Sequence, residues 1–231
     1  MKKVLIIGGS TGVGRALAEQ LSQESWEVIA TYHNTPQSSK GHLSYHQLDV
    51  MDVEADVSFI PDQLDALVYC PGSIVLKPFK RLSDASFLED YKLQVLGAIR
   101  LIRQCLPALQ NSELSSVLLF STVAVQSGYN FHSQVAVSKG AIEGLTRSLA
   151  AEFAPKIRVN CIAPSLTDTP LAHRILSTDE KRQANAQRHP LKRIGSASDI
   201  SEMAAFLLSE KASWITGQVL HVDGGMSSIK M

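Results

Sequence analysis

Three glycines near the N-terminus are spaced for phosphate binding. Gly8, Gly12 and Gly14 follow the apolar run 4–7. Apolar residues at helical spacing come next, at Val13, Ala16, Leu17 and Leu21. A strand, a glycine turn and a helix in this order place a pyrophosphate against free backbone N–H groups and the positive end of the helix dipole. The segment therefore predicts a dinucleotide site, with a purely structural sharp turn as the alternative.

A second group of residues that could do chemistry lies at the start of a helix expected over 132–153. His132, Val135 and Lys139 are spaced i, i+3 and i+7, which puts them on one helix face. An ammonium at position 139 can donate hydrogen bonds to the vicinal hydroxyls of a ribose. A solvated surface lysine is the alternative.

The same helix carries a stripe of small residues, one every four positions. Such a stripe lets another helix approach closely, either at a subunit interface or in internal packing. The stripe consists of Ala136, Gly140, Gly144 and Ser148.

The end of the second expected strand bears on which dinucleotide is preferred. An acidic side chain there accepts hydrogen bonds from a ribose 2′-hydroxyl and repels a 2′-phosphate. Residues 31–34 read Thr-Tyr-His-Asn and offer no carboxylate, whereas Arg15 and His33 could supply positive charge or donors to a phosphate. NADP(H) is therefore favoured over NAD(H). Asp49, after the next strand, could accept from the adenine amine or cap a turn.

These residues are carried by strands that alternate with helices. Strands are expected at 4–7, 27–32, 42–48, 64–69, 117–120, 157–162 and 218–222. Helices are expected after the glycine turn, over 83–109 with Ser83 as N-cap, over 132–153 and from Ser198. Apolar strands alternating with helices predict a doubly wound α/β fold, with a central parallel sheet of about seven strands covered on both faces. No linker marks a second domain, so 1–231 is expected to be one.

Composition limits the classes of partner. The chain has 231 residues, 22 basic and 22 acidic, with a formal net charge of zero. The sequence has no long run of basic or acidic residues. We therefore expect neither a nucleic-acid-binding surface nor a polybasic membrane-binding surface. The cysteines, Cys70, Cys105 and Cys161, match neither a zinc spacing nor a disulfide framework, so no metal is expected. No stretch reaches the roughly 18 apolar residues of a membrane helix. We therefore expect a cytoplasmic protein.

Several motifs, in order along nearly the whole chain, resemble those of the short-chain dehydrogenase/reductase superfamily. Gly8-x3-Gly12-x-Gly14 resembles the cofactor loop and Asp49-Val50 the adenine contact. Residues 138–146 resemble the catalytic helix, and 158–164 with Thr169 the part that holds the nicotinamide. Residues 217–225 resemble the C-terminal signature.

This resemblance implies a Rossmann-like fold, a small-molecule substrate and a homodimer or homotetramer formed through the long helices. It also implies a substrate lid at about 167–193, a segment that reads as polar and mobile. The residues expected to hold the cofactor are Gly8, Ser10, Thr11, Gly12, Val13, Gly14, Arg15, Thr31, His33, Asp49, Val50, Pro71, Gly72, Lys139, Pro164, Leu166 and Thr169.

Departures from the family pattern fall on the catalytic positions. Val135 stands where the family has its tyrosine proton donor, and Thr122 where it has a serine. Gln94 takes the place of the helix asparagine, and Ser165 that of a glycine after Pro164.

Carbonyl reduction leaves negative charge on oxygen that a positioned O–H must stabilise and protonate, and valine cannot do so. Thr122 and Lys139 are expected to act in catalysis, with His132 as a candidate substitute acid. Tyr129 is a further candidate. A histidine that only shapes the pocket or caps the helix is the alternative for His132. Two hypotheses follow. One is an atypical NADP(H)-dependent reductase of small carbonyl compounds with weak or unusual activity. The other is a catalytically silent dinucleotide-binding sensor or scaffold protein.

Overall fold

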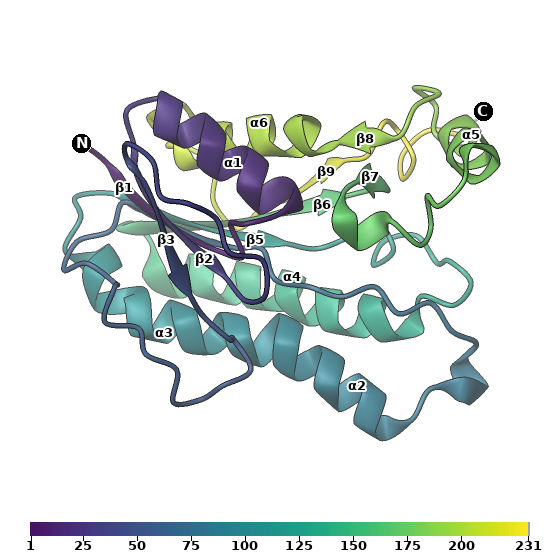
Figure 1. The fold of residues 1–231 in the computed structure, drawn as a ribbon, viewed down its shortest axis with the longest axis horizontal. Coiled ribbons are helices and arrows are strands. Elements are labelled where there is room, and N and C mark those ends of the chain that lie inside the picture. The colour runs from purple at the N-terminus through teal and green to yellow at the C-terminus, as the bar shows by residue number, and fades with distance from the viewer. Residues whose placement is uncertain (231) are drawn as a thin grey trace.

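A seven-stranded parallel sheet forms the centre of the molecule in the computed structural model, which describes residues 1–230 (Figure 1). Its strand order is β3-β2-β1-β4-β5-β6-β9, and every neighbouring pair runs parallel. The strands are β1 (Lys3–Ile7), β2 (Glu27–Tyr32), β3 (Leu43–Gln47), β4 (Ala66–Tyr69), β5 (Ser115–Phe120), β6 (Ile157–Pro164) and β9 (Val219–Val222). The predicted doubly wound α/β fold with seven strands is confirmed.

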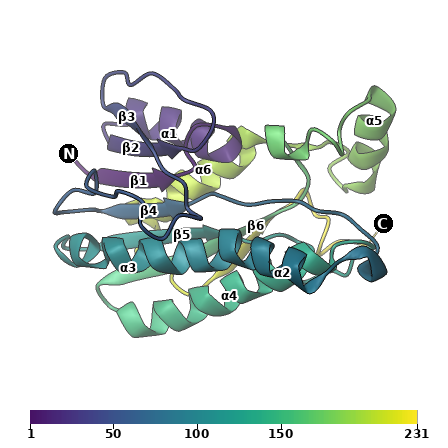
Figure 2. The ribbon, with the colours of Figure 1, turned by 60° about the horizontal axis from the view of Figure 1, so that its bottom comes forward.

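Helices cover both faces of this sheet. Helices α1 (Gly12–Gln23) and α6 (Ala197–Leu208) lie on one face, and α3 (Gly97–Gln110) and α4 (Ser133–Phe153) lie on the other (Figure 2). Successive side chains of a strand point to opposite faces. In β1, Val4 and Ile6 therefore pack in the core beneath α1 and α6, whereas Leu5 and Ile7 pack in the core on the α3 and α4 side.

The helix expected over 83–109 is interrupted. It consists of α2 (Asp84–Tyr91), a π-helical turn at Lys92–Leu96 and then α3. Ser83 caps α2 as predicted, because its hydroxyl accepts from the Ser86 N–H. A π turn inside a helix often marks a functional site, and this one carries Gln94.

Two other helix predictions are now settled. Helix α4 matches its predicted range, 132–153, to within one residue. The last helix begins at Ala197, so its predicted start at Ser198 was late. Ser196 is the N-cap: its hydroxyl accepts from the Asp199 N–H, and the Asp199 carboxylate accepts from the Ser196 N–H. This reciprocal capping box fixes where the helix starts.

The segment 167–193 is more regular than its polar sequence predicted. Strand β7 (Thr167–Asp168) pairs with β8 (Gly195–Ser196), and a 3-10 turn spans Pro170–Ala172. Helix α5 (Asp179–Arg188) is capped by Thr178, whose hydroxyl accepts from the Lys181 N–H. Figure 1 shows α5 at one end of the molecule, beyond the sheet. Two further 3-10 turns lie at Phe79–Arg81 and Glu210–Ala212.

Among residues 1–230, no helix combines the length and the apolar character needed to cross a membrane.

Candidate active site

A cavity of about 830 Å³ opens beyond the carboxyl ends of the parallel strands. Gly8 follows β1, Cys70 follows β4, Ser121 follows β5 and Ser165 follows β6, and all four line it. Ligands of open α/β sheets bind in this position. The topology thus brings together residues from distant parts of the chain.

Nearly all the residues that the sequence singled out line this one cavity. They are Gly8, Ser10, Thr11, Gly12, Val13, Gly14, Thr31, His33, Asp49, Val50, Pro71, Gly72, Thr122, His132, Lys139, Pro164, Leu166 and Thr169.

Arg15 is the exception among the predicted cofactor residues. Its Nε donates to Glu19 Oε1 at 2.7 Å, one turn further along α1, and the side chain is not part of the cavity lining. The guanidinium is directed to a carboxylate on the helix surface, and the expected contribution of Arg15 to phosphate binding stays a prediction.

The glycine turn has the shape that a diphosphate needs. Gly8 and Gly12 have φ of 76° and 54°, in the left-handed region that favours glycine. A Cβ on Gly14 would lie 2.3 Å from the Gly8 carbonyl oxygen. The turn can therefore keep this close strand–helix contact only with glycine at position 14. Helix α1 begins at Gly12, so its N-terminal end faces the cavity.

The end of β2 is hydrogen-bonded to this glycine turn. The buried Thr31 hydroxyl oxygen accepts from the Gly8 N–H at 3.0 Å. His33 Nε2 lies 3.6 Å from Asp49 Oδ2. Asp49 Oδ1 accepts from the Met51 N–H at 2.8 Å, so this carboxylate does cap a turn, one of the two roles considered for it.

Lys139 projects from α4 into the floor of the cavity. Removal of its ammonium from water lowers the pKa of Lys139 to about 8, although nearby Cys161, Asp90 and Cys70 favour the charged form. A Cβ at Gly72 would lie 3.5 Å from Lys139 Nζ and 3.3 Å from Gln94 Oε1. The lack of a side chain at position 72 therefore lets the loop after β4 pass close to both polar atoms.

A buried carboxylate that sequence reasoning missed lies behind these atoms. Asp90 accepts from Gln94 Nε2 at 2.8 Å, from Ser138 Oγ at 2.6 Å and from Ser73 Oγ. It thereby ties α2, α4 and the loop after β4 together. Because Nε2 faces Asp90, the buried Gln94 Oε1 is left without a partner among the described residues. The partners are up to 48 positions apart in sequence, and only the one-turn spacing of Asp90 and Gln94 could have hinted at the pair.

The other side of the cavity carries the remaining catalytic candidates. Thr122 Oγ1 accepts from the Ala124 N–H at 3.3 Å. Val135 is 5% exposed and lines the cavity. His132 Nδ1 lies 2.8 Å from the Asn130 carbonyl oxygen, and its ring lies 5.5 Å from that of Tyr129. His132 precedes α4, but its side chain makes no capping bond.

Comparison with known proteins places this geometry in a family. Residues 8–227 match the family model described as enoyl-(acyl carrier protein) reductase. The chain is 33% identical to a tropinone reductase homolog of Arabidopsis thaliana, over 96% of this chain and 89% of that protein. It is 29% identical to the uncharacterized oxidoreductase YmfI of Bacillus subtilis, over 97% of this chain and 98% of that protein.

The chain is also similar, over nearly its whole length, to solved structures. Ligand-free aldohexose dehydrogenase of Thermoplasma acidophilum is 28% identical, with a TM-score of 0.91 and coverage of 100% of this chain and 96% of that one. ElxO with NADP bound is 27% identical, with a TM-score of 0.89 and coverage of 99% of both chains. A tyrosine-to-phenylalanine variant of ElxO with NADPH bound has a TM-score of 0.88, with the same identity and coverage. The chain belongs to the short-chain dehydrogenase/reductase superfamily, whose members are oxidoreductases that bind nicotinamide dinucleotides.

Proposed function

We propose that this protein reduces a small carbonyl compound with NADPH and does so without the tyrosine that the family uses as proton donor. The observation that carries the proposal is that the glycine turn, the end of β2 and Lys139 line one cavity at the carboxyl edge of the sheet. A diphosphate fits the turn, because Gly8, Gly12 and Gly14 hold backbone shapes and contacts that side chains would obstruct.

Each part of the cavity has a task in this proposal. The N–H groups at the start of α1 bind the diphosphate, and the Lys139 ammonium donates to the ribose hydroxyls next to the nicotinamide. Pro164, Leu166 and Thr169 contact the nicotinamide end, and Asp49 and Val50 contact the adenine end. When bound, the dinucleotide supplies a hydride. Thr122 donates a hydrogen bond to the substrate carbonyl oxygen.

The preference for NADPH is proposed from the residues around the end of β2. Residues 31–34 carry no carboxylate, and His33 and Asn34 line the cavity. The nearest carboxylate, Asp49, already accepts from the Met51 backbone. A 2′-phosphate at this end would therefore meet donors, and His33 Nε2, one of these, lies 3.6 Å from Asp49 Oδ2.

We propose that the segment 167–193 serves as the substrate lid. Its Pro170, Leu171, Ile175 and Arg188 line the cavity. A mixed apolar and basic lining accommodates a small carbonyl compound.

The protein is proposed to form homodimers or homotetramers through α4, in the cytoplasm. Gly144 and Ser148 are exposed on this helix, and a Cβ at Gly144 would meet nothing within 4 Å. A neighbouring helix could therefore approach closely there.

The experiment that tests the proposal measures NADPH and NADH oxidation by the purified chain with a panel of aldehydes, ketones and quinones. We expect slow but saturable NADPH oxidation with at least one class of carbonyl compound and a weaker rate with NADH. Unchanged absorbance across the whole panel would reject the reductase.

A second candidate function, a dinucleotide-binding sensor or scaffold without turnover, is favoured by one observation. Val135 places an apolar side chain in the cavity, four residues before Lys139. In ElxO, replacement of one tyrosine by phenylalanine is compatible with bound NADPH. Normal NADPH affinity with no turnover of any carbonyl compound would identify this second function.

A further inference from the structure

Two side chains in the cavity form a hydrogen-bonded pair that the roles above do not use. Ser165 Oγ and His189 Nε2 are 2.8 Å apart, although the residues lie 24 positions apart in sequence. Ser165 follows β6, and His189 follows α5. Both residues line the cavity, and His189 is only 3% exposed.

The other ring nitrogen of His189 fixes the direction of this pair. His189 Nδ1 lies 2.9 Å from the Asn185 carbonyl oxygen, which can only accept. Nδ1 therefore carries a hydrogen. In the neutral ring, Nε2 is then the acceptor and the Ser165 hydroxyl donates to it. In the protonated ring, Nε2–H donates to Ser165 Oγ, and the serine O–H is free to point into the cavity.

We propose that Ser165 and His189 together donate the proton to the substrate oxygen, in place of the missing phenol. This inference rests on the proposed carbonyl reduction. Ser165 is the catalytic residue because it contacts the substrate, and His189 acts through it.

The step balances with the groups named. The carbonyl carbon accepts the hydride supplied by NADPH, and the π electron pair moves to oxygen. That oxygen takes the proton of Ser165 Oγ–H. Ser165 Oγ in turn takes the proton from Nε2 of the His189 imidazolium, which leaves a neutral ring. One proton from solvent restores the imidazolium, so each turnover consumes one NADPH and one proton.

The geometry favours this pair over His132 as the proton source. His132 Nδ1 also donates to a backbone carbonyl, that of Asn130, but no described side chain hydrogen-bonds to its Nε2. His189 differs because its Nε2 already contacts a hydroxyl that lines the cavity. A serine between the ring and the substrate can both orient the carbonyl and pass the proton.

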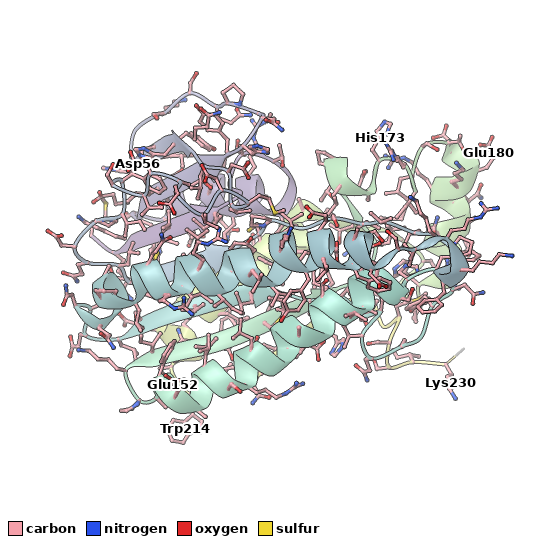
Figure 3. All side chains as sticks on the ribbon, turned by 90° about the horizontal axis from the view of Figure 1, so that it is seen from below. Asp56, Glu152, His173, Glu180, Trp214 and Lys230 are labelled. Carbon is pink, nitrogen blue, oxygen red and sulfur yellow. The ribbon has the colours of Figure 1, made fainter. Side chains whose placement is uncertain are left out.

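Two measurements on the full-length protein test the pair. The first is the two-bond proton–nitrogen NMR spectrum of the ligand-free protein with labelled histidine, which identifies the protonated nitrogen of each neutral ring. The second is steady-state carbonyl reduction, together with calorimetric NADPH binding and thermal unfolding, for Ser165→Ala, His189→Ala, His132→Ala and the control His173→Ala. His173 lies on the same segment but points outward and does not line the cavity (Figure 3).

We expect Nδ1 of His189 to carry a hydrogen, with a shifted Nε2 resonance in Ser165→Ala. Ser165→Ala and His189→Ala should each lower kcat by about 100-fold, the scale of general acid catalysis, with NADPH affinity and unfolding temperature retained. Added imidazole should restore part of the kcat of His189→Ala. The control His173→Ala should keep the wild-type rate, and His132→Ala should lower kcat far less than Ser165→Ala or His189→Ala.

Three results would overturn the inference: a neutral His189 whose single hydrogen is on Nε2, wild-type kcat in Ser165→Ala, or a kcat loss confined to His132→Ala. In each case a working wild-type enzyme leaves the proposed function standing. A wild-type protein that binds NADPH but reduces no carbonyl compound rejects both proposals together.

Discussion

In the proposed reductase, Val135 stands where a proton donor would lie beside the bound cofactor. Val135 and Lys139 are one helical turn apart and line the same cavity, so a phenol at position 135 would lie beside the ammonium. We therefore expect Val135→Tyr to raise kcat for carbonyl reduction, by up to the roughly 100-fold or more that a general acid contributes.

The matched control for this change is Val137→Tyr. Val137 lies on the same helix but is 57% exposed, so a tyrosine there cannot reach the cavity. Steady-state assays of both variants with the best carbonyl substrate check the prediction. Equal rates for Val135→Tyr and the wild type would mean that the cavity no longer holds a carbonyl beside α4.

The proposed role of Lys139 predicts that NADPH binding depends on pH. Burial lowers the pKa of Lys139 to about 8, so the ammonium is charged below this pH and loses its proton above it. The charged form is the better donor to the ribose hydroxyls, and NADPH affinity should fall as pH rises from 7 to 9. Lys139→Met should bind NADPH about 10-fold more weakly at pH 7, equivalent to about 1.4 kcal/mol, and show no step near pH 8.

Calorimetric titration across this pH range measures the effect. A wild-type affinity that stays constant through pH 8, or a step that persists in Lys139→Met, would contradict the proposed role of Lys139.

At the scale of elements, the junction of β1 and α1 depends on one close contact. A Cβ at Gly14 would lie 2.3 Å from the Gly8 carbonyl oxygen, so Gly14→Ala must push the helix away from the strand. We expect this variant to lose measurable NADPH binding and to unfold at a lower temperature. Gly128→Ala is the control, because a Cβ there meets nothing within 4 Å. The measurements are the NADPH affinity and the thermal unfolding temperature of both variants. An unchanged NADPH affinity in Gly14→Ala would contradict the binding of a diphosphate at this turn.

Local patterns in the sequence predicted the elements better than the contacts between them. The apolar β-branched run before Gly8 and the helical spacing after it define β1 and α1, because both patterns act within a few residues. The bounds of α4 also follow from local spacing. The break between α2 and α3 was missed because the chain 83–109 reads as one amphipathic helix, while the π turn places Gln94 against the buried carboxylate of Asp90.

The sequence predicted the site residues that depend on backbone shape, such as the glycines, better than the side chains that contact a partner side chain. Most of the residues singled out from the glycines and the strand ends line the cavity. Arg15 does not line the cavity, because its Nε donates to Glu19, which lies one turn away on the helix surface. The Ser165–His189 contact could not be foreseen, because only the folded sheet brings β6 and the end of α5 together.

At the scale of the whole molecule, α4 presents an exposed stripe that suits a second copy of the chain. Helix α4, which carries Gly144, lies on the sheet face opposite α1 (Figure 1), and a Cβ at Gly144 would meet nothing within 4 Å. Gly144→Arg should convert the proposed dimer or tetramer to monomer in light-scattering measurements. Glu24→Arg, at the exposed end of α1, should leave the assembly intact. A wild-type protein that is already monomeric would contradict the assembly through α4 but not the cavity.

The most direct test of the central claim is a calorimetric titration of the wild-type protein with NADPH at pH 7. We predict saturable binding with one NADPH per chain, and no binding heat with Gly14→Ala. The contradicting result is a wild-type titration without binding heat, together with a thermal unfolding temperature that excess NADPH does not change. That result would show that the cavity does not hold a dinucleotide, and it would contradict the proposed function.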